Sequence, residues 1–279
     1  MKKSLLLVIS FLCTLNFISA QEEKNWWLGS GQTFKIDTLN DSLLFGTGLA
    51  LNGTYLLCDK LLKTKNVAFD GQILDKSSVN AFDQPLMNPY SKKLDTTGDI
   101  FLLTALASPV LFAAAPKNEW FTIAAMYAET ALIANGIKDL TKLIVDRPRP
   151  YMYFEGYPQK EIEERDWCKS FPSGHTTMAF TSAAFNTYVF SRYFPDSPWR
   201  FVVSGVSYAI AVTTAALRLA SGNHFASDVL TGAALGTLCG FLIPWLHTLS
   251  ATDTSGNHGA SPAPTAGILP NGFYLTFKF

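Results

Sequence analysis

Six apolar stretches, each about 16 to 18 residues long and nearly free of charge, recur along this chain of 279 residues. They cover residues 42–58, 100–116, 120–137, 176–191, 201–217 and 229–246. A membrane-spanning helix needs roughly 17 to 25 such residues, so these lengths lie at the lower edge of the range. The pattern predicts an all-α bundle of six helices, which is either a thin polytopic membrane protein or a soluble helical core.

Composition favours the membrane interpretation. Hydrophobic residues make up 48% of the chain and charged residues only 16%, below the roughly 25% that is usual in soluble domains. The 22 basic and 22 acidic side chains cancel, so no net field points to nucleic acid as a partner. We therefore expect the membrane itself to be the partner of this bundle.

Three short polar blocks lie at the ends of the apolar stretches. They read KLIVDRPRP at 142–150, PSGH at 172–175 and RLASGNHFASD at 218–228. The first block follows the third stretch, the second begins the fourth, and the third connects the fifth to the sixth. Because neighbouring helices of a bundle alternate in direction, all three blocks are predicted to meet at one end of it.

The blocks contain the groups that a phosphate pocket needs. Lys142, Arg149 and Arg218 supply positive charge, and a guanidinium group matches phosphate oxygens in a bidentate fork. Pro172 and Ser173 would open a helix, whose free N–H groups and serine hydroxyl suit an anion. The sequence has no HExxH, no CxxC and no run of alternating aspartates. We therefore expect neutralisation of the phosphate by fixed cations, with no metal and no cofactor.

Two histidines supply the chemistry. His224 and Asp228 lie four residues apart, so on a helix the carboxylate can hold the imidazole in one tautomer. This makes His224 a candidate nucleophile, and His175 a candidate acid for the leaving oxygen. Each feature alone fits a structural hydrogen bond, a basic helix end or an ordinary turn. Their joint order and spacing favour a catalytic site.

Taken together, the three blocks resemble the motifs of the type 2 phosphatidic acid phosphatase superfamily. That superfamily also contains bacterial non-specific acid phosphatases, glucose-6-phosphatase and the vanadium haloperoxidases, and the resemblance covers roughly residues 98–248. It implies a phosphohistidine intermediate on His224, oriented by Asp228, with His175 acting first as acid and then as base. It further implies a phosphate-binding set of Lys142, Arg149, Ser173, Gly174 and Arg218. Leu217 departs from the pattern, because the family usually has serine before the arginine of the third block.

The resemblance implies a metal-independent phosphatase of the membrane lipid phosphatase branch. Its expected substrates are lipid phosphate monoesters or pyrophosphates: phosphatidate, phosphatidylglycerophosphate, undecaprenyl pyrophosphate or lipid A phosphate. The alternatives are a secreted soluble non-specific acid phosphatase, a vanadium-dependent haloperoxidase and a non-catalytic lipid-phosphate binder. The oligomeric state has no signal in the sequence.

The expected organisation has four parts. Residues 1–20 have the pattern of a signal peptide, with an uncleaved signal anchor as the alternative. An N-terminal segment with the first apolar helix and a polar loop, 21–97, precedes a catalytic core at 98–249. The last part, 250–279, is expected to be a flexible tail that ends in a short strand.

The direction of the site depends on the first stretch. If the signal is cleaved and all six stretches span, the blocks lie on the cytoplasmic side, together with the lysine-rich segment 60–93. If 42–58 packs without crossing, they face the periplasm. The expected signal peptide and the usual outward-facing site of the family favour an integral protein of the bacterial cell envelope with a periplasmic active site.

Several residues outside the motifs carry weaker expectations. Lys138 and Arg147 fall outside the register of the first block, so we expect them to face headgroups or solvent. Glu129 interrupts the third stretch and is expected to make a polar contact inside the bundle. The loop 151–171 mixes aromatic and acidic residues and is expected to form the rim that selects the group attached to the phosphate, with a solvated connector as the alternative.

Overall fold

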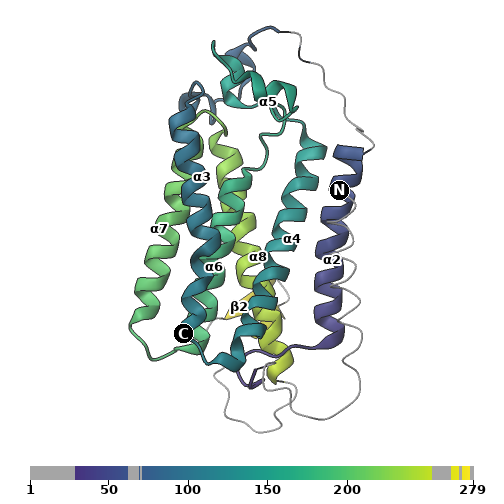
Figure 1. The fold of residues 1–279 in the computed structure, drawn as a ribbon, viewed down its shortest axis with the longest axis vertical. Helices are drawn as coiled ribbons and strands as arrows, with labels where there is room; N and C mark the ends of the chain where they lie inside the picture. The colour runs from purple at the N-terminus through teal and green to yellow at the C-terminus, as the bar shows by residue number, and fades with distance from the viewer. Residues whose placement is uncertain (1–28, 62–68, 70, 253–264, 270–271, 277–279) are drawn as a thin grey trace.

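Six long helices make up most of the described chain, as the apolar stretches predict. The computed structural model describes residues 29–61, 69, 71–252, 265–269 and 272–276. The long helices are α2 (Thr38–Leu56), α3 (Lys92–Ala107), α4 (Trp120–Val145), α6 (Gly174–Tyr193), α7 (Trp199–Ala220) and α8 (Ala226–Thr252). Most of them extend beyond the apolar stretch that predicts them, and these extensions contain parts of the polar blocks. The expected all-α fold is confirmed (Figure 1).

Short elements connect the long helices. They are the π-helical turn η2 (Leu57–Leu61), the 3-10 turns η3 (Lys76–Ser78), η4 (Gln84–Leu86), η5 (Ser108–Ala114), η6 (Lys117–Glu119) and η7 (Pro150–Tyr153), and the one-turn helix α5 (Gln159–Glu163). Elements η7 and α5 belong to the loop 151–171, which lies over one end of the bundle (Figure 1). The polar blocks meet at that same end.

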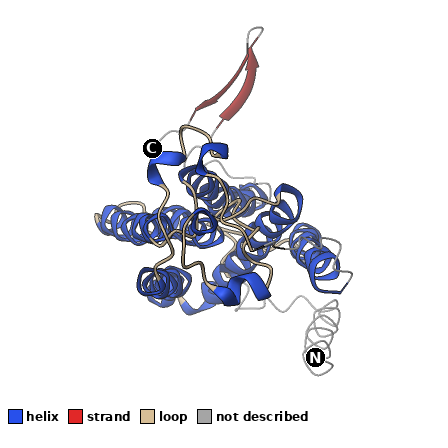
Figure 2. Ribbon diagram, turned by 90° about the horizontal axis from the view of Figure 1, so that it is seen from above, coloured by secondary structure: helices blue, strands red, loops and turns tan. Residues whose placement is uncertain are grey.

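Helix α6 lies at the centre of the bundle and packs against α3, α4, α7 and α8, while α2 lies outside α4. The helix axes run side by side when the bundle is viewed from above (Figure 2). Three glycines of α8 let it approach α6 closely. A Cβ on Gly232 would lie 2.7 Å from the Ser173 carbonyl oxygen, and one on Gly236 or Gly240 would overlap a backbone oxygen of α6. Small residues at this spacing are typical of helices that pack in membranes.

The surface of the bundle is suited to lipid. Within the described chain, the segments Lys92–Ala114, Trp199–Ala220 and Ala226–Thr248 are long and apolar enough to cross a membrane. Large apolar side chains project outward from α3 and α7, among them Leu103, Phe201 and Val206. Many exposed apolar side chains of this kind would be unfavourable in water. The chain is an integral membrane protein, and the expectation of a soluble helical core is not supported.

The two ends of the chain differ from each other. The expected signal peptide, residues 1–20, lies outside the described residues. Near the other end, the predicted strand is present as β2 (Gly272–Thr276), but it is not alone. It pairs antiparallel with β1 (Thr265–Leu269), with Thr265 opposite Thr276. A strand needs a partner for its backbone hydrogen bonds. Strand β1, with the sequence TAGIL, lacks the alternation of apolar and polar residues that predicts β2.

Candidate active site

The three polar blocks meet at one end of the bundle, as their positions in the sequence predict. Helices α4 and α7 end there, and helices α3, α6 and α8 begin there, beneath the loop that contains α5 (Figure 1). All eight residues expected in the site are at this end. Seven of them are buried, and His175 is partly exposed.

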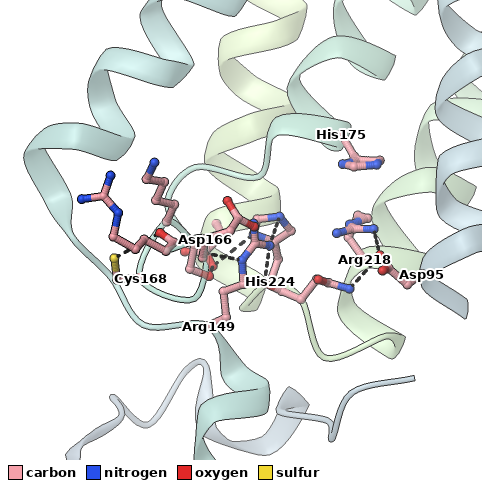
Figure 3. Close-up of polar contacts among 12 residues, drawn as sticks. Asp95, Arg149, Asp166, Cys168, His175, Arg218 and His224 are labelled. Atoms are coloured by element: carbon pink, nitrogen blue, oxygen red, sulfur yellow. Dashed lines mark hydrogen bonds and ion pairs between the residues drawn. The ribbon is translucent and has the colours of Figure 1, made fainter. Parts of the chain in front are cut away.

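Arg149 and His224 form the centre of the site (Figure 3). The Nη1 atom of Arg149 lies 3.3 Å from Nε2 of His224, and it donates a hydrogen bond to the carbonyl oxygen of Asn223 at 3.2 Å. The backbone fixes both residues, because His224 N–H donates to the Arg218 carbonyl and Arg149 N–H donates to the Trp167 carbonyl. Burial, together with the charges of Arg149 and Arg218, lowers the pKa of His224 well below its usual value. His224 is therefore neutral at physiological pH, as a nucleophile must be.

Asp228 lies beside His224, but the two side chains do not form a hydrogen bond. The Nδ1 atom of His224 is 3.7 Å from Oδ2 of Asp228 and has no hydrogen-bond partner. The Asp228 carboxylate instead accepts bonds from the Ser170 hydroxyl at 2.5 Å, the Phe225 N–H at 2.9 Å and Arg147 Nη1 at 2.5 Å. In this structure Asp228 anchors the backbone next to His224.

The expectation that Arg147 faces headgroups or solvent is wrong. Its guanidinium group binds Asp228 through Nη1 and Asp83 through Nη2 at 2.6 Å. Asp83 comes from the polar loop before α3 and also accepts bonds from the N–H and hydroxyl of Ser227. Burial alone would raise the pKa of Asp83, but the bonds from Ser227 and Arg147 lower it to about 2. Arg147 thus connects the polar loop to the beginning of α8.

Lys142, Ser173 and Gly174 meet at the beginning of α6. Ser173 caps this helix, because its hydroxyl accepts the Thr176 N–H at 3.4 Å. A Cβ on Gly174 would lie 3.6 Å from Nζ of Lys142 and 3.4 Å from the Lys138 side chain. The expectation for Lys138 is therefore also wrong: this lysine is buried against the beginning of α6 and pairs with Asp139 at 2.6 Å.

Two aspartates of α3, which sequence analysis missed, complete the other side of the site. Asp95 forms an ion pair with Arg218, and Asp99 Oδ1 lies 2.7 Å from Nε2 of His175 (Figure 3 shows the pair of Asp95 and Arg218). Gly98 lies between these aspartates and permits close contact with Arg218, since a Cβ there would be 3.5 Å from its Cδ. The spacing of the two aspartates, one helical turn apart at the beginning of an apolar stretch, is the only trace of this arrangement in the sequence.

Asp166 is a further residue that sequence analysis did not single out. Its carboxylate forms an ion pair with Arg149 Nη2, and its backbone carbonyl accepts a bond from Arg149 Nε at 3.0 Å (Figure 3). Burial opposes the charge of Asp166, but Arg149 and Lys142 lower its pKa below the usual range. Both guanidinium groups of the site therefore bind a carboxylate. An arginine that pairs with a carboxylate in this way can also bind a phosphate.

Part of the bundle is similar to known proteins. Residues 123–251 match the model of the PAP2 superfamily. A lipid A 1-phosphatase of Porphyromonas gingivalis is 42% identical over 87 residues, which are 31% of this chain and 18% of that protein. We call residues 123–251, which are just under half of the chain, the PAP2 segment.

Two solved structures were also found as neighbours of the fold. One is a transmembrane PAP2-type phosphatidylglycerolphosphate phosphatase from Bacillus subtilis, with a TM-score of 0.43 and 18% identity over 78% of this chain and 98% of its own. The other is LpxE from Aquifex aeolicus, with a TM-score of 0.42 and 19% identity over 63% of this chain and 98% of its own.

The PAP2 segment contains all eight residues that the sequence analysis placed in the site. It does not contain Asp83, Asp95 or Asp99. These three carboxylates come from the chain before the segment, and they bind its residues Arg147, Arg218 and His175, respectively. The site of this chain therefore extends beyond the PAP2 motifs.

Proposed function

We propose that this protein is a metal-independent lipid phosphate phosphatase that acts through a phosphohistidine intermediate on His224. The observation that carries the proposal is the buried pair of His224 and Arg149, in which a neutral imidazole nitrogen lies 3.3 Å from a guanidinium group. A phosphate bound to that guanidinium would have its phosphorus next to the nucleophile. The apolar outer surface of the bundle would keep the lipid part of the substrate in the membrane.

The reaction would proceed in two steps at one phosphorus atom. The substrate phosphate would first replace the carboxylates of Asp166 and Asp95 on Arg149 and Arg218, while Lys142 and the beginning of α6 bind its remaining oxygens. The Nε2 lone pair of His224 would then form a bond to phosphorus. The bond from phosphorus to the lipid oxygen would break, and protonated His175 would give its proton to that oxygen.

The second step would regenerate the enzyme. His175, now neutral, would take a proton from water, and the resulting hydroxide oxygen would attack phosphorus and release His224 together with inorganic phosphate. Asp99 lies 2.7 Å from Nε2 of His175. It is therefore well placed to stabilise the protonated imidazole in the first step and to orient it in the second.

Among the expected substrates, the similarity to the lipid A 1-phosphatase of P. gingivalis favours lipid A phosphate. We propose that the site opens to the periplasmic side of a bacterial cell envelope, where the phosphates of exported lipids are accessible. A cysteine introduced at exposed Glu163, in the loop over the site, tests this direction. A membrane-impermeant maleimide should label Glu163→Cys in intact cells above the wild-type background. Labelling that requires permeabilised inner membranes would place the site on the cytoplasmic side.

A substrate panel tests the function itself. The purified protein in detergent should release phosphate from lipid A, phosphatidate, phosphatidylglycerophosphate or undecaprenyl pyrophosphate, and the rate on soluble phosphomonoesters should be much lower. His224→Ala should lose this activity at least about 10³-fold. Equal activity on lipid and soluble esters would favour a non-specific acid phosphatase, and binding without turnover would favour a lipid-phosphate binder.

A further inference from the structure

A second cluster of titratable side chains lies inside the bundle, far from the phosphate pocket. Asp41 of α2, Glu129 of α4 and His247 of α8 offer ligand atoms that all lie within 4.8 Å of one another. His247 lies near the end of α8 and Asp228 near its beginning, so about 28 Å of helix separates the two sites at 1.5 Å per residue. In Figure 1 this end of α8 points away from the loop that covers the phosphate pocket.

The carboxylates of this cluster are buried and incompletely bonded. Glu129 is 0%, His247 3% and Asp41 7% exposed. Asp41 Oδ2 accepts the Asp37 N–H at 2.6 Å, but Asp41 Oδ1 and Glu129 Oε1 have no hydrogen-bond partner. The unbonded Asp41 Oδ1 lies 3.9 Å from Nδ1 of His247. Two buried carboxylates with free lone pairs are strongly unfavourable unless a positive charge lies between them.

The hydrogen bonds of His247 show which of its ring nitrogens faces the carboxylates as an acceptor. Nδ1 lies 3.2 Å from the carbonyl oxygen of Lys35. A carbonyl oxygen can only accept, so Nδ1 carries the hydrogen and the lone pair of a neutral imidazole is on Nε2. Nε2 lies 2.8 Å from Glu129 Oε2. Two acceptor atoms at this distance require a proton or a metal ion between them, and a histidine that donates its other N–H to a backbone carbonyl is typical of metal ligands.

We propose that Asp41, Glu129 and His247 bind one divalent transition-metal ion, and that Zn²⁺ is the ion that fits them best. Zn²⁺ binds both histidine nitrogen and carboxylate oxygen, whereas Ca²⁺ and Mg²⁺ take oxygen ligands. Tetrahedral bonds of about 2.0 to 2.1 Å separate neighbouring ligand atoms by about 3.3 Å. The separation of 2.8 Å between Nε2 of His247 and Oε2 of Glu129 is somewhat shorter than that value, and Asp41 offers a carboxylate oxygen within 4.8 Å of the other two ligand groups.

The metal ion would connect three helices in the half of the bundle away from the phosphate pocket. Helix α2 packs on α4, and α4 packs on α8, so one ion would hold α2 and α8 to the helix between them. Ionisable side chains inside a membrane bundle are costly, and those that persist usually serve a function. The ion would stabilise the fold and take no part in the transfer of phosphate.

Metal analysis of the purified protein tests this site. Protein without an oligohistidine tag, in detergent, would be stripped with EDTA, incubated with excess Zn²⁺ and desalted, and its metal content measured by plasma mass spectrometry. The wild type should retain about one Zn²⁺ per chain, while Glu129→Gln and His247→Ala should retain less than about a tenth of that amount. The matched control is His224→Ala, which removes a histidine from the phosphate pocket and should retain the full amount.

Thermal unfolding of the wild type gives a second readout that requires no substitution. Zn²⁺ added to the stripped protein should raise the unfolding midpoint by several degrees, and Mg²⁺ at the same concentration should not. Glu129→Gln should show no Zn²⁺ shift, and the milder Asp41→Asn should show a reduced one. The proposal is overturned if the wild type binds no Zn²⁺ and its midpoint does not change, because the carboxylates then share a proton with His247. It is equally overturned if Glu129→Gln and His247→Ala retain the metal, or if His224→Ala loses it.

Discussion

At the scale of single residues, charge determines what the site can do. Burial and neighbouring cations keep His224 neutral, so its lone pair is available without a base to remove a proton. The carboxylate of Asp166 lies on Arg149, the position proposed for a phosphate oxygen. Arg149 therefore contacts both the nucleophile and the anion, and two predictions follow from this arrangement.

The first prediction concerns competition between Asp166 and phosphate. Asp166→Asn removes the negative charge from Arg149 but retains the backbone carbonyl that accepts from Arg149 Nε. Inhibition by inorganic phosphate should strengthen by about 3- to 10-fold, because the anion no longer displaces a carboxylate. Glu163→Gln, which neutralises an exposed carboxylate of the same loop, is the control and should leave the inhibition constant unchanged. Weaker inhibition in Asp166→Asn would mean that Asp166 orients Arg149 and does not compete for it.

The second prediction concerns pH. Because the pKa of His224 is lowered, its nucleophilic neutral form persists as the pH falls, and it is lost only when the pH passes below that pKa. His175 must be protonated in the first step, but burial and the charge of Arg218 lower its pKa to about 2 in the substrate-free site. The negative charge of the bound phosphate would have to raise that pKa, and the rate should then fall as His175 loses its proton in the enzyme–substrate complex. The profile of kcat should therefore be bell-shaped, and the acidic limb of kcat/KM should lie below the usual range of a histidine. An acidic limb centred near pH 7 would contradict a neutral His224 in the free enzyme.

At the scale of elements, the site depends on how the ends of helices are held. Arg147 links Asp83 of the polar loop to Asp228 of α8. The glycines Gly232, Gly236 and Gly240 place α8 directly against α6, so that His224 and Ser173 reach the same end of the bundle. Loss of the Arg147 ion pairs or of the close contact between α6 and α8 should therefore lower stability or activity, although neither is a direct contact with the substrate.

Asp83→Asn tests the link that Arg147 makes between the polar loop and α8. The pKa of Asp83 in the folded protein is lowered to about 2, so its ionised form stabilises the fold above the unfolded pKa of about 3.9. This contribution decreases as the pH falls through 2. At pH 7 the substitution should lower the free energy of unfolding by about 2 to 3 kcal/mol, measured as a lower thermal midpoint in detergent. Asp75→Asn, which changes an exposed carboxylate of the same loop, should have a smaller effect, and equal effects would argue against the role of Arg147.

Gly236→Ala tests the close contact between α8 and α6. Its new methyl group would overlap the carbonyl oxygen of Thr177, so α6 and α8 must separate. We expect a loss of about 1 to 3 kcal/mol of stability and reduced phosphatase activity. Gly205→Ala on α7 is the matched control, because nothing lies within 4 Å of the added Cβ. It should leave both properties unchanged or raise stability slightly. Tolerance of Gly236→Ala would show that the close contact is not required.

At the scale of the whole molecule, the sequence was sufficient for the helices and for their common end, and insufficient for the contacts between distant segments. The six helices follow from apolar length, and the convergence of Lys142, His175 and His224 follows from their positions at helix ends. Asp95 and Asp166 could not be predicted as partners of arginines, because acidic residues at a helix start or in a loop normally face solvent. Their pairing depends on how α3 and the loop pack in three dimensions.

The apolar outer surface of the bundle predicts how the protein behaves when membranes are extracted. Apolar side chains that project from α3 and α7 require lipid or detergent around them. The protein should remain in the membrane fraction after an alkaline carbonate wash and should leave it only with detergent. Release into aqueous buffer would contradict this description and favour a soluble acid phosphatase.

Trapping of the phosphorylated enzyme tests the proposed reaction most directly. The wild type would be mixed with a lipid phosphate labelled with ³²P, quenched in alkali within milliseconds, and the labelled peptide identified by mass spectrometry. We expect label that is stable to alkali, labile to acid and located on His224, and no label in His224→Ala. Label on another residue, or turnover of lipid phosphate by His224→Ala, would contradict the account.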